Sequence, residues 1–193
     1  MSKAIDTTLA SAEFDRMYRA PITPWGDVRI PQELRELIAT CQPRTSLELG
    51  CGIGRFSSFM AKQGIEATGV DFSAVAIEKA RTRTAHDEKQ PTFLIGDVTN
   101  LNMLHEPFDV SFDIGCFQCL DEEGHPKYAA EVYRLLKPGG RHVIWAFYST
   151  PIGVRLSPEY ITQVFGGHFR LAKSTFSLRR LIPARWYWLV REG

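Results

Sequence analysis

Residues 45–54 read Thr-Ser-Leu-Glu-Leu-Gly-Cys-Gly-Ile-Gly, a strand-like run over 45–49 that leads directly into a cluster of glycines. The run is typical of a short buried β-strand, and Phe56, Phe59 and Met60 then recur at the spacing of an α-helix. Glycines between a strand and a helix allow a tight turn and let the backbone approach a ligand closely. The stretch therefore predicts a ligand-binding strand–loop–helix unit, although a plain strand-to-helix turn has the same pattern.

Strand-like and helix-like segments continue to alternate after this loop, which favours a parallel α/β sheet with helices on both faces. Ser73 is a suitable N-cap for the helix after the second strand. A helix over 124–136 is expected to end at the Lys-Pro-Gly-Gly run of 137–140, where glycine and proline stop it. The further strands of this region are expected at residues 66–71, 92–95, 108–112 and 141–148.

The C-terminal segment has a different pattern. Ser157 can cap a helix, and strand-like runs follow at 169–178 and 185–190. Because the connection between these runs is too short for a crossover helix, they are expected to form an antiparallel hairpin.

The N-terminal segment predicts two helices. The first covers residues 8–19 and is amphipathic, and the second begins at Pro31, where the missing N–H of proline costs nothing. The loop between them, 20–30, is interrupted by two prolines.

Three acidic residues lie at the ends of the first three predicted strands. Asp71 ends the second strand, where a carboxylate can accept hydrogen bonds from both ribose hydroxyls. Glu48 precedes the glycine loop, and its carboxylate would repel a pyrophosphate but could hold an ammonium group. Asp97 could accept a bond from an adenine amino group or simply cap the turn that follows it. Surface solvation is the alternative for Glu48 and Asp71.

The glycine spacing indicates which nucleoside fits. Gly50-x-Gly52-x-Gly54 departs from the G-x-G-x-x-G of dinucleotide binding, in which a helix N-terminus holds a pyrophosphate. Together with Glu48, this favours a nucleoside whose tail is a zwitterionic amino acid, namely S-adenosylmethionine. A nicotinamide-dependent (NAD) oxidoreductase is the alternative on a similar sheet.

Five motifs, in order over residues 44–148, resemble those of the class I S-adenosylmethionine-dependent methyltransferases. The resemblance implies a Rossmann-like, doubly wound, mostly parallel sheet of seven strands that ends in the antiparallel hairpin. It also implies methyl transfer from S-adenosyl-L-methionine, with S-adenosyl-L-homocysteine as the product. The motifs are Glu48-x-Gly50-x-Gly52-x-Gly54, Val70-Asp71-Phe72-Ser73, Gly96-Asp97-Val98, Phe108-Asp109-Val-Ser-Phe-Asp113 and Leu135-Leu-Lys-Pro-Gly-Gly140.

The N-terminal segment is similar to the start of the thiopurine, tellurite and methyl halide methyltransferases. In that group a W-D-x-x-Y stretch precedes a P-W pair whose aromatic ring covers the cofactor. Here Phe14-Asp-Arg-Met-Tyr18 precedes Pro24-Trp25, with Phe14 in place of the usual tryptophan. Ile114 replaces the arginine of the group's D-R-G segment, so an arginine-held anion is less expected. Residues 8–30 are expected to form a lid, although Trp25 could also pack this loop on the core.

The resemblance implies a role for each matched residue. The glycines would line the methionine part of the cofactor, with Asp113 or its backbone beside the ammonium group. Phe72 and Val98 would pack on the adenine, whose amino group would bond to Asp97, while Asp71 would hold the ribose. The expected cofactor-binding residues are Trp25, Glu48, Gly50, Gly52, Asp71, Phe72, Asp97, Val98 and Asp113.

The acceptor site is less well defined. Because the cofactor carries an activated methyl group, the protein has to hold an acceptor in line behind it and exclude water. A thiol, selenol or halide needs no protein base, whereas an oxygen or nitrogen acceptor could need one. The candidate catalytic residues are Gln118, Tyr148 and Tyr18, with His125 and Arg155 as further candidates.

Composition narrows the partners. The 193 residues include 23 Lys and Arg against 22 Asp and Glu, a net charge of +1, which argues against nucleic-acid and membrane-surface binding. The start has no secretory signal pattern and no run approaches the ~20 apolar residues of a membrane span, so a cytoplasmic location is expected. Cys116-x-x-Cys119 could be a redox pair or half a zinc site, but no second ligand pair follows, so no metal is expected.

The sequence thus predicts one methyltransferase domain over 1–193, present as a monomer or homodimer and acting on a small molecule. N-terminal helices and a lid (1–43) would precede the cofactor-binding core (44–148), and a C-terminal helix and hairpin (149–193) would follow it. Only ~40 N-terminal residues and short loops then remain to shape the acceptor site, which favours a small acceptor. A non-catalytic module that senses the cofactor or binds a partner is the alternative from another class.

Overall fold

The computed structural model describes residues 7–20, 23, 29–149, 153–179 and 182–193, and the chain divides into two units, residues 1–97 and 98–193. The predicted single domain with its three segments stays a prediction.

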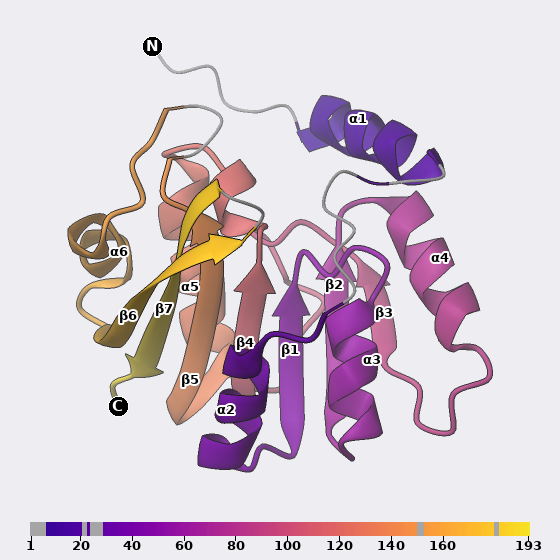
Figure 1. Cartoon of the computed structure of the whole chain (residues 1–193), viewed down its shortest axis with the longest axis horizontal. Coiled ribbons are helices and arrows are strands. Elements are labelled where there is room, and N and C mark those ends of the chain that lie inside the picture. The colour runs from indigo at the N-terminus through magenta and orange to yellow at the C-terminus, as the bar shows by residue number, and fades with distance from the viewer. Residues whose placement is uncertain (1–6, 21–22, 24–28, 150–152, 180–181) are drawn as a thin grey trace. The chain divides into compact units, whose positions relative to one another are not determined.

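The first unit is built on three parallel strands. Its described elements are α1 (Thr7–Arg19), α2 (Gln32–Cys41), β1 (Thr45–Leu49), α3 (Arg55–Lys62), β2 (Glu66–Asp71), α4 (Ala74–Thr84) and β3 (Thr92–Ile95). The strands lie in the order β3-β2-β1 (Figure 1), and Val70 pairs with Leu49 on one side and Leu94 on the other. Leu47, Leu49 and Val70 have no exposed surface, as expected of strands in a parallel sheet.

The second unit carries the antiparallel part of the fold. Its described elements are β4 (Phe108–Ile114), the 3₁₀ helix η1 (Phe117–Cys119), α5 (Gly124–Leu135), β5 (Leu136–Phe147), α6 (Pro158–Phe165), β6 (Phe169–Arg179) and β7 (Ile182–Arg191). The strand order is β4-β5-β7-β6, with β4 and β5 parallel and the other two pairs antiparallel. The predicted C-terminal hairpin is therefore confirmed, and both of its strands are longer than the sequence suggested.

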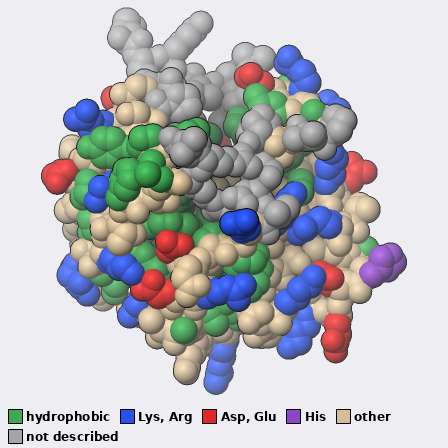
Figure 2. All heavy atoms as spheres, in the orientation of Figure 1, with side chains coloured by type: hydrophobic (Ala, Val, Ile, Leu, Met, Phe, Trp, Pro, Cys, Tyr) green, Lys and Arg blue, Asp and Glu red, His purple; other side chains and the backbone are tan. Residues whose placement is uncertain are grey.

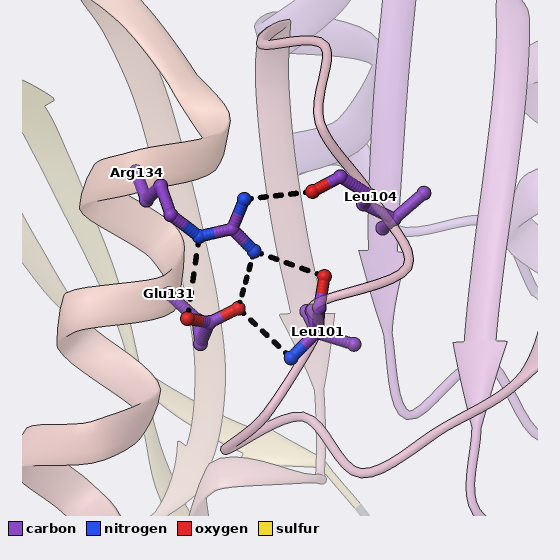
Figure 3. A network of polar contacts seen from close by, with 4 residues as sticks. All are labelled: Leu101, Leu104, Glu131 and Arg134. Carbon is purple, nitrogen blue, oxygen red and sulfur yellow. Dashed lines mark hydrogen bonds and ion pairs between the residues drawn. The ribbon is translucent and has the colours of Figure 1, made fainter.

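A loop of the second unit is held to α5 by hydrogen bonds from the side chains of Arg134 and Glu131 (Figure 3). The Arg134 guanidinium donates to the carbonyl oxygens of Leu104 at 2.7 Å and Leu101 at 2.9 Å. It also pairs with Glu131 at 2.6 Å, and the same Glu131 oxygen accepts a bond from the Leu101 N–H at 2.9 Å. These contacts fix the loop that leads into β4.

The Lys-Pro-Gly-Gly run is where the expected boundaries are wrong. The helix ends at Leu135, and residues 137–140 lie inside β5, whose register with β4 shifts between Phe108 and Val110. A Cβ on Gly140 would lie 2.7 Å from the Lys137 carbonyl oxygen and 3.0 Å from the Asp109 carbonyl oxygen. The glycine therefore allows the backbone to fold closely on itself within the irregular strand pair, so that the strand continues.

The predicted α/β fold class is confirmed. The seven described strands pair mostly in parallel, and the last two form an antiparallel hairpin. Within the described ranges, no helix has both the length and the apolar character that a membrane span requires. Figure 2 shows Lys and Arg side chains distributed over the face in view, with acidic and apolar side chains between them.

Candidate functional site

The glycine loop of the first unit joins β1 to α3 in a conformation that favours glycine. Gly50, Gly52 and Gly54 have φ values of 68°, 51° and 69°, in the left-handed region. A Cβ on Gly54 would lie 2.3 Å from the ring of Phe93, so only glycine allows α3 to begin this close to β3. The Cys51 N–H donates to the Val70 carbonyl at 2.9 Å, which ties the loop to the end of β2.

Glu48 lies beneath this loop and is only 2% exposed. One of its carboxylate oxygens accepts bonds from the Ser57 N–H at 2.7 Å and the Ser57 hydroxyl at 2.5 Å. The carboxylate therefore satisfies a free N–H in the first turn of α3, where the helix dipole favours negative charge. Sequence reasoning missed Ser57 as a partner, and the proposed contact of Glu48 with an ammonium group stays a prediction.

Asp71 is the buried carboxylate at the end of β2, with 4% of its surface exposed. Its two oxygens accept bonds from the Gly52 N–H at 2.7 Å and the Ser73 N–H at 2.9 Å. Burial raises the pKa of the Asp71 carboxyl to about 6, against the opposing effect of these two bonds. Because each carboxylate oxygen has a second lone pair, the group can still accept bonds from ribose hydroxyls.

The helix α1 lies against this loop within the first unit. Tyr18 is buried, and its hydroxyl oxygen lies 2.7 Å from the position of a Cβ on Gly52. Asp15 accepts a bond from the Ser73 hydroxyl at 2.5 Å, and Phe14 packs on Phe72 with ring centroids 5.1 Å apart.

The lid over 8–30 stays a prediction, and Trp25 lies outside the described residues. Asp15 was missed as a positioning residue, although it occupies the aspartate position of the W-D-x-x-Y pattern.

The expected adenine-binding residues follow β3. Asp97 is half-buried and comes directly after Gly96, whose N–H donates to the Asp71 carbonyl oxygen at 3.0 Å. The structure therefore brings the chain at Asp97 next to the end of β2. Val98, the first residue of the second unit, is 7% exposed. The adenine contacts of Phe72, Asp97 and Val98 stay predictions.

In the second unit, Asp113 is fully buried near the end of β4. Its carboxylate accepts bonds from the N–H groups of Cys116 and Phe117, both at 2.7 Å, and from the Tyr128 hydroxyl at 3.0 Å. Burial raises the pKa of this carboxyl to about 7, while the three bonds oppose the rise. The side chain thus folds the turn at 113–119, which the sequence did not indicate.

Gln118, one of the predicted catalytic candidates, lies on that turn and is buried. Its Oε1 accepts a bond from the Phe147 N–H at 2.6 Å, which leaves the two amide hydrogens as donors. Tyr148 follows Phe147, is half-buried, and has the Arg155 guanidinium 5.4 Å from its ring centroid. The ring nitrogens of His125 are bonded to the Tyr160 hydroxyl and the Phe117 carbonyl, so His125 fits a structural role.

The cysteines are all unbridged, and Cys119 is exposed while Cys116 is half-buried. Among the described residues, no group of three or more His, Cys, Asp or Glu side chains could hold a metal ion.

Comparison with known proteins gives the family. A family model described as "Methyltransferase domain" matches residues 47–140. An uncharacterised methyltransferase of Schizosaccharomyces pombe is 30% identical over 104 residues, which are 54% of this chain and 72% of that protein. The chain belongs to the class I S-adenosylmethionine-dependent methyltransferases.

Further similarities agree with the assignment of this chain to the methyltransferases. The ubiquinone biosynthesis O-methyltransferase of Alkalilimnicola ehrlichii is 29% identical over 170 residues, 83% of this chain and 65% of that enzyme. The solved structure of Burkholderia thailandensis 1,6-didemethyltoxoflavin-N1-methyltransferase with bound S-adenosylhomocysteine has a TM-score of 0.80 at 17% identity, covering 100% of this chain and 92% of that chain. The Rossmann-like fold is thereby confirmed.

S-adenosylmethionine is the cofactor of this methyltransferase, which decides against the nicotinamide alternative. The residues present fit it, since the buried Asp71 carboxylate at the end of β2 accepts a bond from the glycine loop and can still accept bonds from ribose hydroxyls. The thiopurine, tellurite and methyl halide subgroup stays a prediction.

Proposed function

We propose that this methyltransferase transfers the methyl group of S-adenosylmethionine to a small-molecule acceptor by in-line displacement. The observation that carries the proposal is the Asp71 carboxylate, buried at the end of β2 and bonded to the Gly52 N–H of the glycine loop. The cofactor supplies an activated methyl group, so this chain has to bind, orient and exclude water.

Each unit contributes its own residues to this proposal. In the first, Asp71 accepts from the ribose hydroxyls, Asp97 accepts from the adenine amino group and Phe72 packs on the ring. In the second, Val98 packs on the adenine and Asp113 acts beside the ammonium group through its turn or backbone. Trp25, Glu48, Gly50 and Gly52 complete the proposed cofactor-binding residues.

For the acceptor, we propose that Gln118 donates a hydrogen bond from its Nε2, with Tyr148 and Tyr18 as further contacts. The bond from Phe147 to Oε1 supports this, because it fixes which end of the Gln118 amide faces the ligand. Neither buried histidine supports a base, since the ring nitrogens of His125 and His142 are bonded within the protein. An acceptor that reacts without a protein base, such as a thiol, fits this arrangement, and an oxygen or nitrogen acceptor would need a base from another residue.

The small size of the acceptor is supported by relatives whose names specify ubiquinone biosynthesis and demethylmenaquinone. The net charge of +1 supports a function without nucleic-acid or membrane partners. The four free cysteines support a cytoplasmic location. A monomer or homodimer is proposed on the size of the chain.

The test is calorimetric titration with S-adenosylhomocysteine, followed by S-adenosylmethionine turnover on a panel of small thiols, phenols, amines and halides. We expect binding, and turnover on at least one class. Asp71→Ala should weaken binding by about 2–3 kcal/mol, the strength of hydrogen bonds to a charged group. Binding without turnover on any class would favour the non-catalytic module, and unchanged affinity of Asp71→Ala would show that the ribose site is elsewhere.

A further inference from the structure

The turn at residues 113–119 is held by two buried histidine–tyrosine pairs that the proposed function does not use. Both histidines, His125 and His142, have no exposed surface. One pair reaches the Asp113 carboxylate and the other reaches the Phe117 carbonyl. The turn carries Gln118, so its shape decides where that side chain is presented.

The first pair forms a directional chain of hydrogen bonds. With Asp113 ionised, the Tyr128 hydroxyl donates its only proton to the carboxylate at 3.0 Å. His142 Nε2, 3.1 Å from the Tyr128 oxygen, must then be the donor of that contact. The other nitrogen, Nδ1, is left to accept from the Ser111 hydroxyl at 2.7 Å. One tautomer of a neutral His142 thus satisfies every group from Ser111 to Asp113.

The second pair links the turn to α5, which carries His125, and to α6, which carries Tyr160. The Phe117 carbonyl oxygen can only accept, so His125 Nε2 donates to it at 3.1 Å, and Nδ1 accepts from the Tyr160 hydroxyl at 2.8 Å. The imidazole also stacks on the Phe117 ring, with centroids 4.2 Å apart. Burial lowers the pKa of both histidines, to about 3 for His142, and so favours the neutral form of each ring.

The groups that bond to the Asp113 carboxylate in this turn are uncharged. The Asp113 carboxylate accepts bonds from two backbone N–H groups and one hydroxyl, and no Lys or Arg of the described part of the chain pairs with it. Such a network holds one geometry when complete, and removing one member leaves a buried polar group unpaired, which destabilises that geometry.

We propose that Tyr128 and His142 are positioning residues, which act through Asp113 to hold the 113–119 turn in the shape that cofactor binding needs. This rests on the proposed function, in which Asp113 contributes to the cofactor site. Neither side chain touches the cofactor in this proposal. Their effect on binding is transmitted by the turn.

The test compares Tyr128→Phe with Tyr133→Phe, a matched change on the same helix. The Tyr133 ring stacks on His168 and Arg191, contacts that phenylalanine keeps. We expect Tyr128→Phe to raise the Kd for S-adenosylhomocysteine about tenfold, in line with a lost bond to a charged group, and Tyr133→Phe to stay within about twofold.

His142 gives a rescue and a spectroscopic readout. Glutamine can accept and donate like the neutral imidazole, so His142→Gln should keep most of the affinity, whereas His142→Leu should lose it. The ¹⁵N shifts of His142 should report an Nε2–H tautomer in the wild type. If Tyr128→Phe does not fold, Ser111→Ala breaks the far end of the same chain and should weaken binding less.

Hydrogen exchange with and without S-adenosylhomocysteine separates the two proposals. Increased protection of residues 115–119 in the wild type supports the turn's place in the site. If that protection appears but Tyr128→Phe and His142→Leu bind like the wild type, the proposed function stands and the positioning role is overturned. If the wild type binds without any change at the turn, the assignment of Asp113 to the site is wrong, and the positioning role is overturned with it.

Discussion

Asp71→Asn separates the contribution of the Asp71 charge from that of its hydrogen bonds. Burial raises the pKa of this carboxyl from 3.8 to about 6, and one pKa unit corresponds to about 1.36 kcal/mol, so the ionised group costs about 3 kcal/mol well above pH 6. A carboxyl whose pKa is raised by folding favours the folded state when protonated. The wild type therefore loses this stability as the pH rises through about 6.

Asparagine has no such titration. Its one carbonyl oxygen can accept from either the Gly52 or the Ser73 N–H, and the other N–H then faces the side-chain NH2 group. This lost bond should reduce the stability by about 1–3 kcal/mol at any pH. The penalty in the wild type is about 1 kcal/mol at pH 4.5 and about 3 kcal/mol at pH 7.5. Relative to that of the wild type, the free energy of unfolding of Asp71→Asn should therefore be about 2 kcal/mol larger (more stable) at pH 7.5 than at pH 4.5.

The assay is urea unfolding of the apo protein at both pH values, where groups common to the two proteins cancel. Asp87→Asn is the control of opposite sign, because the contacts of Asp87 with Lys62 lower its pKa. Binding should respond differently: Asp71→Asn should weaken S-adenosylhomocysteine about tenfold or more at pH 7.5 by the loss of a charged acceptor. A stability difference that is the same at both pH values would refute the assignment of a buried, raised carboxyl.

Three further changes test other parts of the structure. Gly54→Ala should destabilise the protein by about 2–4 kcal/mol, through the strain of a left-handed backbone and the clash with Phe93. Gly139→Ala is the control, because its φ is 76° but the space around it is open, so only the strain should reduce its stability. Equal losses of stability in thermal unfolding would contradict the clash. Arg134→Ala should cost about 1–2 kcal/mol and increase hydrogen exchange in the loop before β4, and unchanged exchange would count against the fastening role. Because burial lowers the pKa of His142 from 6.5 to about 3, the wild type should lose about 2 kcal/mol of stability when the pH falls from 7 to 5. His142→Gln should not show this loss. An equal acid response of the two proteins would refute the lowered pKa.

Local patterns were sufficient for much of the fold. The three strands of the first unit end where the sequence predicts, because each is a short strand-like run followed by turn residues. Ser73 and Ser157 cap their helices as expected, accepting bonds from Ala76 and Tyr160 at 3.1 Å and 3.3 Å. The predicted helix end and strand start were wrong around residues 137–140, because Gly140 allows close backbone contacts that no local propensity encodes.

The candidate site likewise combines features that the sequence determined with features that only the packing determined. The sequence by itself determined the glycine loop, the acidic residues at strand ends and the S-adenosylmethionine chemistry, because these depend on short motifs whose spacing and order can be read along the chain. Only the tertiary structure decided which groups hold them: Asp15 on Ser73, Tyr18 over Gly52, and Tyr128 on Asp113. A hydrogen bond forms between groups that packing brings within about 3 Å, and partners 15 to 58 residues apart meet only after the helices have docked.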